Sequence, residues 1–311
     1  DHRDLHLSIR RQRQMCIRDS GISLNSFKEK LKRTNSLLKD VREKRVHPII
    51  DKKIIFSWNA LTLRGLVESY KVTKDKKFLS KALSLNNSLA NLMIDKNKIQ
   101  HTNSNPASVL FFEDYSYYID ALIGLYEITF DRNYLIKAEE FVNYSNEFFG
   151  DENGFYKFST EQGSLFADTL INLEDGVLPS ANSVMNFNLF RLGHYNGNKQ
   201  LLLHSKKMIN NISDNINDRV TDHLLWLSNS QNYSQKFYEL AVSGTDAFLK
   251  AEELMEMYLP NSLIAASNKP SELYLLKDRY FKDETYIYVC VDNTCKFPVS
   301  DVKQAINLMK D

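Results

Sequence analysis

Residues 57–82, SWNALTLRGLVESYKVTKDKKFLSKA, are repeated 56 residues later as residues 113–138, EDYSYYIDALIGLYEITFDRNYLIKA. The two stretches share leucine, tyrosine, threonine, aspartate, lysine and alanine at aligned positions. Apolar residues recur within each stretch at helical spacing, and a short polar turn such as residues 131–133 separates two helical segments. Because so short a turn makes consecutive helices antiparallel neighbours, each copy predicts one helical hairpin.

A third, looser copy follows at an offset of 66 from the second, with Ser180 opposite Asp114 and Leu201 opposite Leu135. The spacing predicts helices over residues 24–39, 58–72, 76–94, 114–129, 132–148, 181–195, 198–215 and 219–230. After about Gln235 the pattern changes to β-rich runs over residues 237–242, 262–266 and 285–291, with helices over 246–258 and 301–309. The repeat is longer than the about 34 residues of a tetratricopeptide unit, which favours an α/α toroid.

The predicted fold class is therefore mainly α, an α/α toroid of helical hairpins with a small C-terminal α/β appendage. We expect the toroid portion over residues 21–234 and the α/β segment, packed on the toroid, over residues 235–311. Residues 1–20 contain five arginines without helical periodicity and lack an initiator Met. We interpret them as a non-native or disordered tail.

Composition excludes several classes of protein. The 40 basic residues balance 39 acidic residues, so the net charge of +1 provides no broad field to attract nucleic acid or anionic lipid. No apolar run approaches the roughly 18 residues that span a bilayer. We therefore expect a soluble protein without nucleic-acid or membrane partners.

Cysteine content points to a reducing compartment. The three cysteines, Cys16, Cys290 and Cys295, are too few for a disulfide-built secreted scaffold, so a cytoplasmic location is the default. Cys290 and Cys295 have no second pair with which to bind zinc, and their spacing differs from C-x-x-C. We expect two reduced structural cysteines, no metal and no cofactor.

Three polar clusters open three successive helices in matching register: Ser57-Trp58-Asn59, Glu113-Asp114-Tyr115 and residues 179–183, Pro-Ser-Ala-Asn-Ser. If those helices are the inner members of their hairpins, the repeat brings the clusters to one rim. Plain helix capping by Ser57, Asp114 and Ser180 is one interpretation. The other is a ligand site for a carbohydrate or polyol, because rings and amides suit such ligands. Its candidate binding residues are Trp58, Asn59, Tyr115, Ser180, Asn182 and Ser183, although core packing of Trp58 is an alternative.

Carboxylates near the rim are candidates for glycosidic chemistry, which needs two carboxylates flanking one bond. Glu113 and Asp114 are adjacent and point about 100° apart on a helix, so at most one faces a cavity squarely. Asp51 and Asp175 precede the first and third clusters, so either is a candidate partner. Arg42 and Arg45, in a charged stretch before the first cluster, are candidates for anion recognition, with a solvated salt-bridged segment as the alternative.

Histidines would serve a sugar epimerase as acid and base. None of the usable ones begins an inner helix, and only His47 lies near the expected rim. The others are His101, His194, His204 and His223. The epimerase interpretation is therefore the weaker one.

Several segments, in order, resemble the YyaL and spermatogenesis-associated protein 20 family. They are Val41 to Pro48, Asp51-Lys52-Lys53, Ser57 to Ala60, Phe112 to Tyr115, Asp175 to Ser183, and Tyr288 to Val299. The resemblance covers roughly residues 35–310. It implies an N-terminal thioredoxin-like domain followed by an (α/α)6 toroid of the six-hairpin glycosidase and epimerase type. One departure is Lys52, which stands where the family pattern has a second acidic residue.

The resemblance also implies that this chain carries only the C-terminal part of such a protein, with an incomplete ring. One expected function is a carbohydrate-active enzyme, in which Glu113 or Asp114 acts with Asp175 or Asp51. The alternative is a noncatalytic toroid that presents a ligand or protein to the thioredoxin-like domain. Whether the chain is an enzyme is left open at this stage.

Overall fold

The computed structural model describes residues 21–103, 109–160, 170–292 and 294–310. The chain divides into two compact units, Asp1–Lys52 and Lys53–Asp311. In the first, helix α2 (Leu24–Glu43) is capped by Ser23, whose hydroxyl accepts from the Ser26 amide at 3.2 Å. No residue of α2 is buried. The expected tail over residues 1–20 lies outside the described residues.

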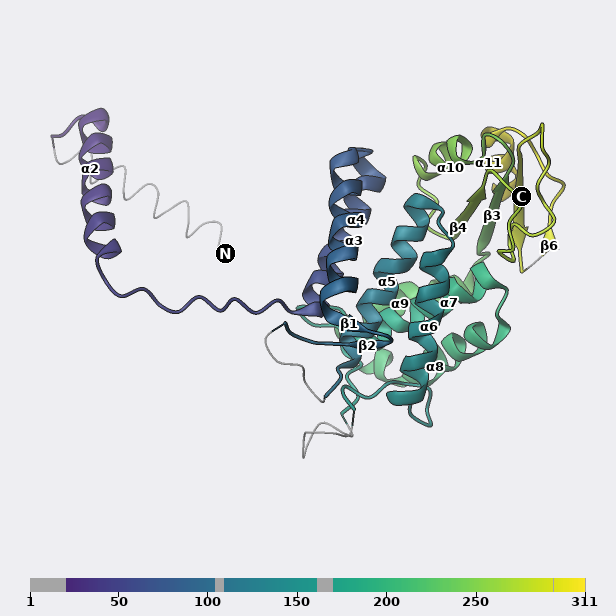
Figure 1. Ribbon diagram of the computed structural model, residues 1–311, viewed down its shortest axis with the longest axis horizontal. Helices are drawn as coiled ribbons and strands as arrows, with labels where there is room; N and C mark the ends of the chain where they lie inside the picture. The colour runs from purple at the N-terminus through teal and green to yellow at the C-terminus, as the bar shows by residue number, and fades with distance from the viewer. Residues whose placement is uncertain (1–20, 104–108, 161–169, 293, 311) are drawn as a thin grey trace. The chain divides into compact units, whose positions relative to one another are not determined.

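Three helical hairpins begin the second unit, as the repeat predicted (Figure 1). They are α3 (Phe56–Thr73) with α4 (Lys76–Met93), α5 (Phe112–Thr129) with α6 (Asn133–Phe148), and α7 (Ala181–Asn196) with α8 (Lys199–Asp218). Helix α5 packs between α3 and α7 as well as on α6, which makes α3, α5 and α7 the inner helices. Two strands, β1 (Ile94–Asp95) and β2 (Lys98–Ile99), follow α4, while η1 (Val220–Asp222) and α9 (Leu224–Ser234) follow α8.

The turns of the first two hairpins explain why the repeat is visible in the sequence. Helices α3 and α5 each end at a left-handed residue, Lys74 at φ 55° and Phe130 at φ 55°, whose amide bonds back four residues to a tyrosine carbonyl. The aspartate that follows accepts from an amide two residues on, at 2.8 Å for Asp75 and 3.0 Å for Asp131. This aspartate satisfies an amide that the next helix leaves unpaired.

The C-terminal region forms a four-stranded sheet with the order β4-β3-β5-β6. Its elements are β3 (Tyr238–Ser243), α10 (Ala247–Met255), β4 (Ser262–Ser267), β5 (Tyr286–Val291), β6 (Thr294–Cys295) and α11 (Val302–Lys310). Strands β3 and β4 are parallel and are joined through α10, whereas β5 runs antiparallel to β3. The mainly helical fold with a small α/β segment is thus confirmed.

Successive side chains of the strands point to opposite faces of the sheet, so the sheet lies between two hydrophobic cores. Ala241 and Leu263 join the core of the helical hairpins, while Leu240, Val242 and Ile287 pack with α10 and α11. The helices and the sheet therefore share one compact unit from residue 53 onward. The domain boundary expected near residue 235 remains a prediction.

The expectation of two reduced cysteines is wrong, because Cys290 and Cys295 form a disulfide. They lie directly opposite each other in the β5–β6 ladder, a proximity that sequence spacing alone did not reveal. Both sulfurs accept from the guanidinium of Arg279, at 3.5 and 3.2 Å. Among the described helices, none combines the length and apolar character that a membrane span requires.

Candidate functional site

The N-terminal ends of α3, α5 and α7 converge, and we call this end of the hairpins the rim. The Ser57 amide donates to Asp114 Oδ1 at 2.9 Å, and its hydroxyl donates to Glu113 Oε1 at 3.0 Å. From α5, the Ser116 hydroxyl donates to the carbonyl of Ala181 at 2.6 Å. Hydrogen bonds thus join the start of α5 to the starts of both neighbouring helices, and the three sequence clusters lie together.

Asp114 is part of a buried carboxylate–imidazole pair. His101 follows β2, and its Nδ1 lies 3.0 Å from Asp114 Oδ2. The Asp114 side chain is 0% exposed, whereas that of His101 is 24% exposed. The sequence pointed to His101 as one of the usable histidines but did not place it at the rim, because it does not begin an inner helix. The available signal was its place in the segment that leads into α5, since such a segment must end at the rim.

The environment of the pair shifts both pKa values upward. Burial raises the pKa of Asp114 to about 6, although the hydrogen bond to His101 and its charge oppose the shift. The hydrogen bond to Asp114 raises the pKa of His101 against the effect of burial. Because the two groups interact closely, they titrate as a pair. The pair can therefore exchange protons near neutral pH, as acid–base catalysis requires.

We expect His101→Gln to cost stability in a pH-dependent way. The folded pKa of His101 is above its unfolded value, so the stability from its protonation is present below about pH 6.5 and is lost as pH rises through the folded pKa. The wild-type advantage in free energy of unfolding should therefore shrink as the pH rises above about 6.5. Urea titrations of both proteins measure it, and an advantage that grows with pH would contradict this assignment.

Glu113 is the more accessible carboxylate of the cluster. It is partly buried and lines a small cavity of about 30 Å³ with Tyr117, Tyr156 and Asn182 among its other walls. One oxygen of Glu113, one of Asp114 and one ring nitrogen of His101 lie within 4.8 Å of one another. The two adjacent carboxylates meet because both accept from Ser57, although the helix directs their side chains apart. This donor set is of a type that can also hold a cation such as Zn²⁺.

The cluster at the start of α7 serves as a helix cap. Ser180 Oγ accepts from the amides of Asn182 and Ser183 at 3.2 and 3.4 Å. Asp175 Oδ1 accepts from the Ser180 amide and the Ser183 hydroxyl, both at 2.9 Å, and its Oδ2 accepts from the Leu225 amide at 2.8 Å. Asp175 therefore joins the N-termini of α7 and α9.

Asn182 and Ser183 point into the protein. The Asn182 side-chain amide bonds both the amide and the carbonyl of Tyr156, at 2.8 and 3.0 Å. Ser183 is 0% exposed and bonds Asp175. The predicted sugar-binding residues Ser180, Asn182 and Ser183 are thus buried and occupied within the protein.

The capping interpretation needs correction for the other two clusters. Helix α3 begins after Ile55 and α5 after Phe111, and neither residue provides a side-chain cap. Ser57 and Asp114 therefore do not cap their own helices, and the capping interpretation is wrong for both. Asp114 instead accepts from the Ser57 amide of the neighbouring α3. Each helix begins earlier than expected because a phenylalanine precedes the polar cluster and is buried.

Burial separates the two aromatic candidates for ligand binding, Trp58 and Tyr115. Trp58 is 58% exposed, so the core-packing alternative is wrong, while Asn59 bonds the carbonyl of Ile55 at 2.8 Å. Tyr115 is 0% exposed and stacks on Tyr144 with ring centroids 5.4 Å apart. Its hydroxyl bonds main-chain atoms of residues 97 and 99, both at 3.0 Å. Tyr115 is a core residue here, and the role of stacking on a ligand is contradicted.

The remaining candidates belong to the first compact unit. Arg42 lies in the last turn of α2, and Arg45 and Asp51 follow that helix. All three fall within Asp1–Lys52, so their proposed contributions to the rim remain predictions.

Comparison with known proteins shows relatives of low sequence identity. No family model matches the chain. Spermatogenesis-associated protein 20 of Homo sapiens is 24% identical over 321 residues, which cover 95% of this chain and 41% of the relative. An uncharacterized protein of Caenorhabditis elegans is 27% identical over 187 residues, or 57% of this chain and 26% of that protein. The resemblance to the spermatogenesis-associated protein 20 family is confirmed, and the chain spans about two fifths of the length of the human protein and of the proteins of the same name from Mus musculus and Rattus norvegicus.

Solved structures with similarity include two carbohydrate-active enzymes. An alpha-mannanase of Bacteroides thetaiotaomicron matches with a TM-score of 0.44 and 18% identity, over 53% of this chain and 44% of the other. Cellobiose 2-epimerase of Bacillus thermoamylovorans matches with a TM-score of 0.44 and 16% identity, over 53% and 45%.

Proposed function

We propose that the rim performs acid–base chemistry on a hydroxyl-rich small molecule, a carbohydrate. Glu113 and His101 exchange protons with the ligand, and Asp114 positions the imidazole. The observation that carries this proposal is the approach of three donor atoms, one from each residue, to within 4.8 Å of one another. Trp58 supports the carbohydrate class, because it follows Ser57 directly and its exposed indole suits stacking on a sugar ring.

The three residues have different roles because their exposure differs. Asp114 is fully buried and bonds His101 Nδ1, so it fixes the orientation and tautomer of the ring without meeting the ligand. His101 can then transfer a proton through Nε2. Glu113 is partly exposed, and within the described residues its Oε1 accepts from the Ser57 hydroxyl, which leaves the second oxygen for a substrate hydroxyl or carbon-bound proton.

Proton transfer is favoured over glycoside hydrolysis. Hydrolysis needs two carboxylates that both reach the scissile bond. Of the adjacent pair, only Glu113 is accessible, and Asp175 is occupied by three hydrogen bonds at two helix N-termini. An isomerase or epimerase needs only one carboxylate and one imidazole. The weaker interpretation at the sequence level thus becomes the preferred one, because His101 lies at the rim.

The test is turnover of a sugar panel. The chain is incubated in D2O with neutral hexoses and their α- and β-linked disaccharides, and proton NMR follows deuterium exchange, isomer formation and hydrolysis. We expect exchange at a carbon next to the carbonyl for at least one sugar. Glu113→Gln and His101→Gln should each lower that rate about 100-fold, the usual contribution of an acid or base. Glu140→Gln, on the exposed side of α6, is the matched control and should leave the rate unchanged.

Two outcomes would contradict this function. Hydrolysis without exchange would return Asp175 or Asp51 to consideration as the second carboxylate. If no sugar is turned over and no sugar stabilises the chain against heat, the carbohydrate class is excluded.

A noncatalytic ligand-binding or protein-binding role is the second candidate. It is favoured by the internal use of Tyr115, Ser180, Asn182 and Ser183, which leaves the rim with few free polar groups. Sugars would then stabilise the chain without being converted. For the whole protein, we further propose a thioredoxin-like domain, which the toroid would serve. We also propose a cytoplasmic location.

A further inference from the structure

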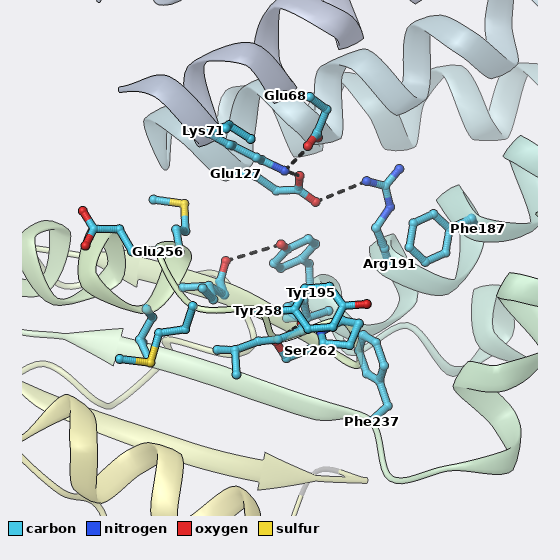
Figure 2. A pocket seen from close by; sticks show the side chains of 18 of the residues that line it. Glu68, Lys71, Glu127, Phe187, Arg191, Tyr195, Phe237, Glu256, Tyr258 and Ser262 are labelled. Carbon is cyan, nitrogen blue, oxygen red and sulfur yellow. Dashed lines mark hydrogen bonds and ion pairs between the residues drawn. The ribbon is translucent and has the colours of Figure 1, made fainter. Parts of the chain in front are cut away.

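A second cavity lies toward the C-terminal ends of the inner helices and is separate from the rim. Its volume is about 730 Å³, within the range of small-molecule sites. Helices α3, α5 and α7 form one side, and the end of α10 with β4 forms the other (Figure 2). The charged lining residues are Arg64, Glu68, Lys71, Lys74, Glu127, Arg191 and Glu256.

Glu127 is the centre of an ion-pair network in this cavity. It pairs with Lys71, with Arg64 at 3.3 Å and with Arg191 at 3.2 Å, as Figure 2 shows for Lys71 and Arg191. Burial alone would raise the pKa of Glu127, but the charges of Lys71, Arg64 and Arg191 hold it well below its usual range. Glu68 and Asp120 complete the network through pairs with the same cations.

One lysine of the cavity lining stands outside the network. Three cations, Arg64, Lys71 and Arg191, pair with three carboxylates, Glu68, Asp120 and Glu127. Lys74 also lines the cavity, but it is in none of these pairs. Glu256 also lines the cavity, but it is exposed, and Figure 2 shows its carboxylate turned away from Lys71 and Glu127. The network is therefore balanced in charge, and Lys74 is the cation of the lining that these carboxylates leave unpaired.

Two buried donors in this cavity have no partner within the described part of the chain. They are Nζ of Lys74 and Nε of Arg191, whose residue is only 3% exposed. Burying a charged hydrogen-bond donor without an acceptor lowers the stability of the folded protein. A protein therefore retains such a donor where a bound ligand supplies the acceptor. The rest of the Arg191 guanidinium is held by Asp120 and Glu127 and lies 4.4 Å from the ring centre of Phe187.

We propose that this cavity binds a small molecule with one anionic group and a largely apolar body. A carboxylate or phosphate pairs with Lys74 Nζ and accepts from Arg191 Nε, which satisfies both donors. The body packs against the aromatic lining, which includes Phe187, Phe237 and Tyr258. This site does not depend on the chemistry proposed for the rim, because different residues at the other end of the hairpins form it.

The test measures binding of simple probes by calorimetry at low salt. Benzoate and phenyl phosphate carry the two kinds of anionic group, benzamide is the neutral analogue, and inorganic phosphate lacks the apolar body. We expect at least one aromatic anion to bind ten times more tightly than benzamide, and phenyl phosphate to bind more tightly than phosphate. The stronger of the two aromatic anions identifies the preferred group.

Lys74→Met separates a ligand role from a structural one. It should lower the affinity for the anion at least tenfold while the melting temperature without ligand stays the same or rises, because the variant removes an unpartnered ammonium. Lys77→Met is the matched control, since this exposed lysine does not line the cavity. The proposal is overturned if neither anion binds at 10 mM, if benzamide binds equally well, if phosphate matches phenyl phosphate, or if Lys74→Met leaves the affinity unchanged.

Discussion

Glu127→Gln is expected to lower the free energy of unfolding by about 3–5 kcal/mol, because it breaks a buried ion-pair network from its centre. The amide leaves Arg64, Lys71 and Arg191 without their shared carboxylate, and Arg191 is almost fully buried. Urea denaturation followed by circular dichroism measures the loss. The matched control is Glu68→Gln, whose half-exposed side chain pairs with two of the same cations. It should cost at most about 1 kcal/mol, as surface pairs do.

The effect of Glu127 should depend on pH in a definite direction. Its folded pKa is depressed below the unfolded value of 4.5, so its contribution is fully present above that value. The difference between wild type and Glu127→Gln should therefore hold at neutral pH and shrink as pH falls below about 4.5. If Glu68→Gln and Glu127→Gln cost equal amounts, the network does not depend on the buried carboxylate.

The repeat alignment already contained the main pairs of this network. An offset of 56 residues places Arg64 opposite Asp120 and Lys71 opposite Glu127, and both pairs form contacts across α3 and α5. Equivalent positions on two neighbouring helices of a repeat array lie side by side. A change of charge sign between copies is therefore a detectable signal for an interhelical ion pair, which sequence reasoning did not use.

Helical hairpins could be predicted because their signals are local. Apolar spacing and the recurring turn aspartates Asp75 and Asp131 lie within a few residues of the elements that they define. The predicted starts of α3 and α5 were late by two residues, since Phe56 and Phe112 open the helices without a polar cap. Periodicity does not locate a helix start that is set by burial of an aromatic ring.

The site could be predicted only in part, because its partners are brought together by tertiary contacts. Serine and acidic residues at equivalent positions indicated the rim, but the pairing of His101 with Asp114 depends on how the segment after β2 returns to α5. The burial of Tyr115 depends on coverage by Tyr144 from α6. Neither contact has a signature in the residues nearby.

Asp175→Ala is expected to cost about 3 kcal/mol of unfolding free energy, which would assign this carboxylate to the fold. The variant removes three hydrogen bonds, each worth about 1 kcal/mol, and two of them satisfy amides at the starts of α7 and α9. Denaturant titration of the variant measures the loss. Glu174→Ala is the matched control, because its exposed pair with Arg219 should contribute less than about 1 kcal/mol.

A comparison of Asp175→Ala with Asp175→Asn decides whether this carboxylate is structural or catalytic. Asp175→Asn keeps a side-chain oxygen that can accept from Ser180 or Leu225, so a purely structural residue should lose less stability as Asn than as Ala. A catalytic carboxylate would instead lose sugar turnover equally in both variants, because neither can ionise. If Asp175→Ala kept the stability of wild type but abolished turnover, Asp175 would be the second carboxylate that hydrolysis requires, and the preference for proton transfer by Glu113 and His101 would be wrong.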